Sequence, residues 1–234
     1  MPEAQETTSI GVPVRLRDRP GWLYLLAEFE ALYRLGSAGG SKAIRSHRRR
    51  VRAALSAILD ANPAVVERAP EEKPVTAHLG RAFDLGAVSV AGGLSRALER
   101  VAPELTWEYG YAKVPASLAK KYAYCEVLGP QGPVLSERLI LGFVLFAPDT
   151  TYPQHSHSDI EESYVSVAGA WSENELAVYA PGSLILNRPG HEHRITTGEA
   201  DPCLLAYAWI GPDERLAVPG MKFSRTRRRV EKGI

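Results

Sequence analysis

The sequence predicts an α+β protein that is mainly β, in which a helical N-terminal region precedes a small C-terminal β-barrel. Between Trp22 and Val101, apolar residues recur at the three- and four-residue spacing of a buried helix face. From Trp107 onward, β-branched and aromatic residues alternate with turns, and no long helical period persists. We therefore expect four parts: an extended arm over residues 1–20, a helical region over 21–106, the barrel over 107–213 and a basic tail over 214–234.

The helical region is predicted to contain several helices. An apolar stripe over residues 22–33 indicates the first, and Gly36 interrupts the chain after it. Apolar positions over residues 44–58 indicate a second helix, which is expected to end near Asn62, and residues 94–101 indicate a later one. We expect these helices to pack on the barrel or to form a dimer interface.

The barrel is predicted from shorter segments. Residues 139–146 and 165–167 are rich in apolar and β-branched side chains, as in buried strands, and Gly169 follows the second segment. Residues 176–190 form a further stretch that ends in a Pro–Gly turn. Side chains that point inward from neighbouring strands would line the interior of such a barrel.

Composition narrows the class of protein. A chain of 234 residues with 45% hydrophobic content can bury a substantial core, and a net charge of +1 provides no overall field for nucleic acid. Cys125 and Cys203 form no CxxC pair, which is typical of a reduced, cytoplasmic protein. The sequence shows neither the apolar core of a secretory signal nor the roughly 20 apolar residues of a membrane helix. We expect a soluble protein with no membrane partner.

Two basic clusters could contact phosphates. One comprises five arginines within residues 45–52, on the predicted second helix, and the other lies at residues 225–229 in the tail. Acidic residues such as Glu28 and Glu30 dilute this charge, and no compact helix-turn-helix pattern is present. We interpret the clusters as a solvated helix face and a chain end, and expect no nucleic-acid partner.

The histidines carry the functional signal. Four of the six, His155, His157, His191 and His193, fall within one short segment, close to the acids Glu161 and Glu162. Imidazole and carboxylate are common ligands of divalent ions. If His155 and His157 share a strand, they point to the same face and can reach one ion together. The alternative is a group of solvated histidines on a polar loop, which would require several coincidences.

The same residues resemble the motifs of the cupin family, whose barrel is a double-stranded β-helix or jelly roll. The first cupin motif has two histidines one residue apart, a glutamate shortly after them, and a glycine seven residues beyond the glutamate. His155, His157, Glu162 and Gly169 match it, whereas Glu161 would place the glycine one residue too far. The resemblance therefore implies that Glu162 is the carboxylate ligand.

The second cupin motif is a glycine, a Pro-x-Gly turn and a histidine three residues beyond the turn. Gly182, Gly190 and His193 match it. Arg188 stands where the motif usually has its first proline, and Asp149 stands where a glycine normally precedes the histidine pair. Neither departure removes a ligand. The implied ligands are thus His155, His157, Glu162 and His193, with His191 outside the pattern.

A closer resemblance exists within the cupins. Tyr152 just before the histidine pair and Tyr164 two residues after Glu162 are similar to the dimethylsulfoniopropionate lyases of marine bacteria, and the chain length and helical N-terminal part resemble their DddL branch. This resemblance implies a carbon–sulfur lyase that cleaves a small zwitterion into dimethyl sulfide and acrylate. It also implies one divalent ion per chain (zinc, manganese, iron or nickel, with zinc or manganese favoured) and a homodimer.

Such a lyase needs a base beside the metal, because the reaction removes a proton next to the substrate carboxylate. A nearby dication favours the phenolate form of tyrosine, so Tyr164 is the expected base and Tyr152 the alternative, or a hydroxyl that orients the substrate. A sulfonium favours aromatic faces. The aromatic residues available in the barrel half are Trp171, Tyr207, Trp209, Tyr122 and Tyr124.

Two other functions use the same metal ligands. A cupin dioxygenase would require oxygen for turnover, and a non-catalytic, ligand-sensing cupin regulator would bind DNA without turning over any small carboxylate. Both remain alternatives on the sequence alone.

Overall fold

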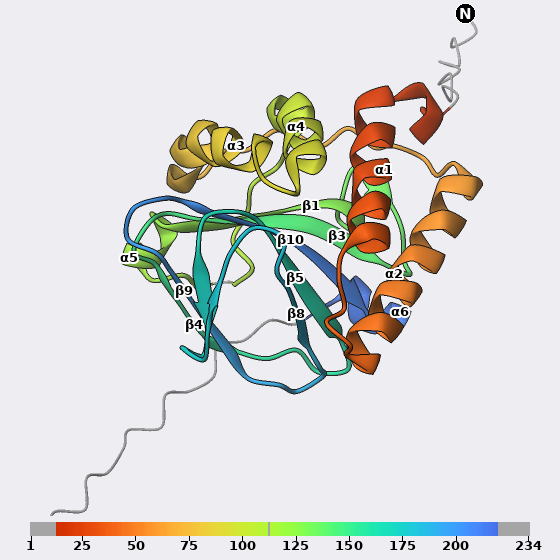
Figure 1. The fold of residues 1–234 in the computed structure, drawn as a ribbon. Coiled ribbons are helices and arrows are strands. Elements are labelled where there is room, and N and C mark those ends of the chain that lie inside the picture. Colours follow the sequence, from red (N-terminus) through yellow and green to blue (C-terminus); the bar gives the residue numbers. More distant parts are fainter. Residues whose placement is uncertain (1–12, 112, 220–234) are drawn as a thin grey trace, which may run out of the picture.

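The computed structural model describes residues 13–111 and 113–219, and shows helices on one side of a β-barrel (Figure 1). Most of the predicted N-terminal arm and the basic cluster at residues 225–229 lie outside the described residues. The helices are α1 (Pro20–Leu35), α2 (Lys42–Ala61), α3 (Leu79–Ala87), α4 (Gly92–Val101), α5 (Ala116–Ala119) and α6 (Asp213–Ala217), with 3-10 turns at Leu16–Asp18, Pro74–His78 and Ala102–Glu104.

Residues at the helix termini determine where α1 begins and where α2 begins and ends. Pro20 occupies the first turn of α1, where its missing N–H has no partner to lose. Ser41 caps α2, its hydroxyl accepting a hydrogen bond from the backbone N–H of Ile44 at 3.2 Å. Asn62 ends the same helix in the left-handed conformation, with φ 49°. The predicted end of the second helix is confirmed.

The strands form two sheets. The larger sheet has the order β2-β1-β3-β10-β5-β8, and the smaller has the order β4-β9-β6-β7. The pairings are antiparallel except for β1 with β2. The strands are β1 (Tyr122–Gly129), β2 (Val134–Leu135), β3 (Ile140–Phe146), β4 (Thr151–His155), β5 (Glu161–Ala168), β6 (Trp171–Glu173), β7 (Val178–Tyr179), β8 (Leu184–Asn187), β9 (His193–Thr197) and β10 (Cys203–Ile210).

Both faces of the larger sheet are buried. Every residue of β3 is buried, because one face of the strand lies under the helices and the other lines the barrel. On the helix side, the rings of Phe29 in α1 and Phe143 in β3 pack with centroids 5.1 Å apart. Helices α1, α3 and α4 lie over this face in Figure 1. The helical region therefore covers the sheet that carries much of the barrel interior.

Two glycines of the predicted motifs occupy left-handed turns, at φ 75° for Gly169 and 76° for Gly190. Their surroundings differ. A Cβ atom at Gly169 would lie 2.3 Å from the carbonyl oxygen of Pro202, whereas one at Gly190 would have no neighbour within 4 Å. Both turns favour glycine by conformation, but only that of Gly169 also requires it by close approach.

This contrast yields a stability prediction. Gly190→Ala should lower the free energy of unfolding by about 1 kcal/mol, the cost of a left-handed residue with a Cβ. Gly169→Ala should cost about 3 kcal/mol, because the backbone clash adds to that strain. Urea denaturation of the two variants beside the unsubstituted protein measures the difference. Equal losses would show that the turn at Gly169 relaxes freely.

Candidate functional site

Four buried side chains converge inside the barrel. His155, His157, Glu162 and His193 each offer one ligand atom, and these atoms all lie within 4.8 Å of one another. They come from different parts of the fold: His155 ends β4, Glu162 lies in β5, and His193 begins β9. The structure thus brings together the four residues that the sequence predicts as metal ligands. The solvated-loop alternative does not hold for them, since all four are buried.

The sheet pairing sets the spacing of the cluster. His155 and His193 are direct partners in the β4–β9 ladder, and their ring centroids are 4.1 Å apart. His157 differs from the expectation of a shared strand, because β4 ends at His155 and His157 follows in the loop. There its carbonyl oxygen accepts a hydrogen bond from the backbone N–H of Gly190 at 2.8 Å. The second histidine is therefore positioned by a contact between the two motifs rather than by strand alternation.

Hydrogen bonds orient several of these side chains. Nδ1 of His155 lies 3.0 Å from the carbonyl oxygen of Pro153, and Nδ1 of His193 lies 3.1 Å from that of His191. An imidazole that donates through Nδ1 leaves Nε2 as the atom that can bind a metal. The indole N–H of Trp209 donates to Oε1 of Glu162 at 2.7 Å, which leaves Oε2 facing the cluster.

The donor set fits a divalent ion. The buried Nε2 atoms of His155, His157 and His193 and Oε2 of Glu162 have no hydrogen-bond partner. Oε2 lies 3.1 Å from Nε2 of His193. Burying several such atoms unpartnered is unfavourable unless something binds them. Three imidazoles and a carboxylate are suitable ligands for a transition-metal ion.

Protonation in the cluster also suits a metal. Burial, with the neighbouring His193, lowers the pKa of His155 to about 3, so this imidazole is neutral near pH 7. Burial alone would raise the pKa of Glu162, but His157 and His193 outweigh it and hold that pKa well below its ordinary value. For His193, burial acts to lower the pKa, and contact with Glu162 raises it overall. The cluster therefore combines an ionised carboxylate with at least one imidazole, that of His155, that is neutral near pH 7.

Glu161 and His191, which lie close to the predicted ligands in the sequence, are outside the cluster. Oε1 of Glu161 is 2.6 Å from Nδ1 of His47 in α2, and Glu161 also pairs with Arg50. His191 is exposed, with its Nδ1 3.2 Å from Oδ1 of Asn187. Neither belongs to the group of possible metal ligands.

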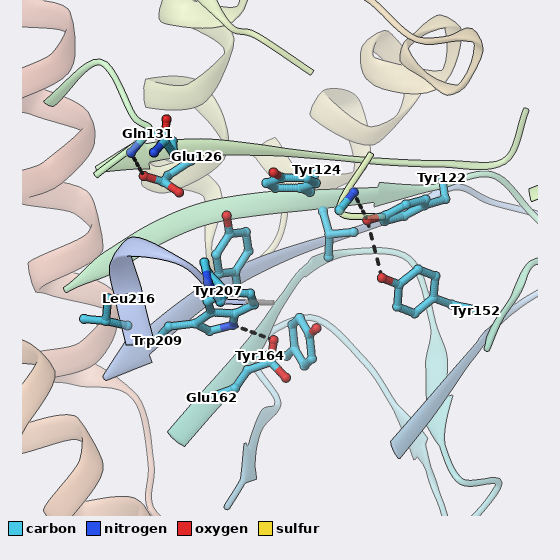
Figure 2. Close-up of a pocket in the computed structure, with 13 residues that line it drawn as sticks. Tyr122, Tyr124, Glu126, Gln131, Tyr152, Glu162, Tyr164, Tyr207, Trp209 and Leu216 are labelled. Atoms are coloured by element: carbon cyan, nitrogen blue, oxygen red, sulfur yellow. Dashed lines mark hydrogen bonds between the residues drawn. The ribbon is translucent and has the colours of Figure 1, made fainter. Parts of the chain in front are cut away.

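A pocket of about 140 Å³ opens beside Glu162 (Figure 2). Trp171, one of the predicted aromatic contacts, lies outside its lining and donates to the hydroxyl of Ser166 at 2.6 Å. The other predicted aromatic and catalytic residues line the pocket: Tyr122, Tyr124, Tyr152, Tyr164, Tyr207 and Trp209.

Sequence reasoning missed one charged residue of this pocket, Glu126 in β1. A signal for it exists in the alternation of that strand. Tyr122 and Tyr124 precede Glu126 at two-residue intervals, so all three share one face. A single acid in an apolar strand does not by itself indicate which face is the interior.

The double-sheet barrel and its buried cluster of three histidines and one glutamate define a cupin with a candidate metal site. Residues 47–205 match the family model for dimethylsulfoniopropionate lyase. A relative from Cereibacter sphaeroides (strain ATCC 17023), named provisionally as the dimethylsulfoniopropionate lyase DddL, is 72% identical over 94% of this chain and 96% of its own length. The chain belongs to the dimethylsulfoniopropionate lyase family, and is a carbon–sulfur lyase by that membership.

Solved structures support the fold. A chain from the crystal structures of the dimethylsulfoniopropionate lyases RdDddP and RnDddQII is 21% identical, with 88% of this chain and 99% of that chain covered and a TM-score of 0.62. The lyase DddQ from Ruegeria pomeroyi DSS-3 is 23% identical, with 82% and 92% covered and a TM-score of 0.63. Within the described residues, the helices are too short or too polar to cross a bilayer.

The hydrogen bond from Trp209 yields a prediction about metal affinity. Trp209→Phe removes the N–H that orients Glu162, and should weaken binding of Zn²⁺ by about tenfold. Trp171→Phe is the matched control, because it removes the indole N–H of another buried tryptophan, which donates to Ser166 instead. Competition with a chromogenic chelator measures both affinities. Equal weakening in the two variants would mean that the loss reflects barrel packing.

Proposed function

We propose that this chain cleaves dimethylsulfoniopropionate to dimethyl sulfide and acrylate by a metal-dependent β-elimination, with Tyr164 as the base. The ion would be held by His155, His157, Glu162 and His193. One observation carries the proposal: Tyr164 and the ligand Glu162 line the same pocket. Family membership supports the reaction, and the donor set described above supports the metal.

The metal ligands and the residues that line the pocket would have different roles. When bound, a divalent ion supplies positive charge that polarises the substrate carboxylate and favours a phenolate nearby. The chain's own side chains then determine how the substrate lies. The carboxylate end is directed to the histidine cluster, and the aromatic walls of Tyr207 and Trp209 exclude water along the rest of the molecule.

Tyr164 would act on the carbon next to the substrate carboxylate. It follows Glu162 by two residues in β5, so both side chains point into the barrel. Its phenolate would take the proton from that carbon. The electron pair of the C–H bond forms the carbon–carbon double bond of acrylate, and the C–S bond breaks with its pair on sulfur, releasing dimethyl sulfide.

Burial sets a condition on this base. Burial is the largest cause that raises the pKa of Tyr164 well above its ordinary value, and Glu162 raises it further. A phenol in this position keeps its proton until positive charge arrives nearby. Tyr164 would therefore abstract a proton only when a metal ion is bound nearby.

Tyr152 is better suited to orienting the substrate. Its hydroxyl contacts those of Tyr111 at 2.9 Å and Tyr122 at 3.4 Å, and its ring lies 4.8 Å from that of His155. Burial raises its pKa as well. A hydroxyl held in this cluster of phenols would donate a hydrogen bond to a substrate carboxylate.

The homodimer and the identity of the metal, with zinc or manganese favoured, stay predictions.

A headspace assay for dimethyl sulfide tests the reaction and the base together. Tyr164→Phe should bind metal as the unsubstituted protein does and lower kcat by at least about a hundredfold, because general-base catalysis contributes that much. Tyr152→Phe should lower turnover by less than about tenfold, the effect of one lost hydrogen bond.

Metal analysis of the same samples is the control. His193→Ala should lose metal and activity together, since it removes a ligand. A Tyr164→Phe protein that keeps full activity would remove Tyr164 as the base. No release of dimethyl sulfide by the metal-loaded, unsubstituted protein would remove the proposed reaction.

Acid should inactivate the enzyme through metal loss. Metal and proton compete for Nε2 of His193, whose pKa is raised by Glu162, so a metal-free site takes up this proton at or above the ordinary imidazole pKa of about 6.5. His155, with its pKa of about 3, stays neutral over this range. Activity and bound metal should therefore fall together as the pH drops below about 6.5, and excess metal should shift the acid limb downward. An acid limb that does not move with metal concentration would contradict this.

A further inference from the structure

A second carboxylate faces the pocket that contains Glu162. In β1, Tyr122, Tyr124 and Glu126 line the pocket, whereas the intervening Ala123 and Cys125 belong to the core under the helices. Glu126 thus continues an inward row of aromatic side chains. In Figure 2 it lies at the opposite side of the pocket from Glu162, with Tyr207 between them.

The register of the larger sheet connects Glu126 to the part of the pocket that contains Glu162 and Tyr164. Glu126 pairs with Gly142 in β3, Gly142 with Tyr207 in β10, and Tyr207 with Tyr164 in β5. Three strand spacings separate the Cα atoms of Glu126 and Tyr164 by about 14 Å along this row. Side chains that point inward from both ends shorten the gap to a distance that a small extended zwitterion can span.

Because Gly142 has no side chain, the middle of this row has space for the ring of Tyr207. A Cβ atom there would lie 2.4 Å from the hydroxyl oxygen of Tyr207, so the Tyr207 ring lies across the space that a side chain would fill. Its hydroxyl is 3.4 Å from the carbonyl oxygen of Cys125 in β1. The ring of Tyr207 therefore spans from the metal side of the pocket toward Glu126.

The carboxylate of Glu126 is held in place by backbone. The N–H of Gln131 donates to Oε1 at 2.7 Å, and the N–H of Gly132 also contributes. Gly129 lets the turn close over it, since a Cβ there would lie 2.3 Å from Oε1. Among the described residues, no lysine or arginine forms an ion pair with Glu126. An acid so arranged is available to a cationic ligand.

We propose that Glu126, with the faces of Tyr124 and Tyr207, binds the sulfonium end of the substrate and makes the pocket selective for a carboxylate that carries a cation. This inference rests on the proposed function, which places the carboxylate end at the histidine cluster. A sulfonium has no N–H to donate, so its recognition depends on an anion and on aromatic faces. A carboxylate with an uncharged alkyl end offers neither attraction.

The attraction acts on the bound substrate rather than on the transition state. Positive charge on sulfur decreases as the C–S bond breaks, and dimethyl sulfide leaves neutral. An interaction that weakens along the reaction favours binding without raising kcat. Loss of Glu126 should therefore raise the dissociation constant for a cationic ligand.

The ionisation of Glu126 is poised near neutral pH. Burial raises the pKa of Glu126 to about 7, and the N–H groups of Gln131 and Gly132 oppose this rise. Glu108 raises the same pKa and Arg68 lowers it. The phenols of Tyr124 and Tyr207 also face Glu126, and burial raises the pKa of each. The carboxylate is ionised above about pH 7, so the preference for a cation should decline as the pH falls below that value.

The test compares two ligands of one shape. β-Alanine betaine carries a trimethylammonium group, and its carbon isostere carries a tert-butyl group in the same position. Calorimetric titration of the metal-loaded protein should show at least about a tenfold preference for the betaine. In Glu126→Gln the preference should fall to within about twofold. Affinity for the uncharged isostere should stay unchanged, which shows that the variant is folded.

Glu108→Gln is the matched control. Glu108 is exposed, lies 3.4 Å from the hydroxyl oxygen of Tyr124, and lines no part of the pocket beside Glu162. This variant should keep the preference for the betaine. An equal loss in both variants would overturn the assignment in favour of a general negative potential. If Glu126→Gln kept the preference for the betaine and the protein still released dimethyl sulfide, the assignment of Glu126 would be overturned, but the proposed function would not. No binding of either ligand and no release of dimethyl sulfide would overturn the proposed function as well.

Discussion

The two-residue alternation of β5 is the constraint on which the site depends. Glu162 and Tyr164 point into the barrel, while Glu161 and Ser163 point toward the helices. A slip of one residue would exchange these pairs and place Glu161 at the histidines. The strand pairs with β10 from Glu161 to Ala168 and with β8 from Glu162 to Val165, so the register of the segment that carries the site is fixed from both sides. The strand register thus specifies the candidate ligand, the candidate base and the outward-facing acid together.

The outward side of β5 explains why a helical region accompanies this barrel. His47 in α2 contacts both Ser163 and Glu161, at 2.8 and 2.6 Å, and Tyr33 in α1 lies 2.8 Å from the same Ser163 hydroxyl. Buried polar groups of this kind are unfavourable unless each finds its partner, so helices and strand must associate in one register. The helices therefore do more than cover apolar surface, because they satisfy the polar atoms next to the candidate metal ligand Glu162.

Much of this arrangement could be predicted from the sequence, and the failures share a cause. Spacing of three and four residues predicts α1 and α2, and the position of Gly169 distinguishes Glu162 from Glu161. Both signals are local. The position of His157 depends instead on a contact with Gly190, which lies 33 residues further along the chain (190 − 157). The exposure of Glu126 to the pocket depends on which face of β1 the helices cover. Neither can be derived from neighbouring residues alone.

Burial shifts the pKa values of the acids and of the imidazoles in and beside this pocket in opposite directions. It raises the pKa of Tyr164 and Glu126 and lowers that of His155, so each group shifts toward its neutral form. Glu162 departs from this trend because two imidazoles adjoin it. A metal ion at one end would favour the phenolate of Tyr164, and a sulfonium at the other would favour the carboxylate of Glu126, so bound ligands would add to the charge that Glu162 already carries.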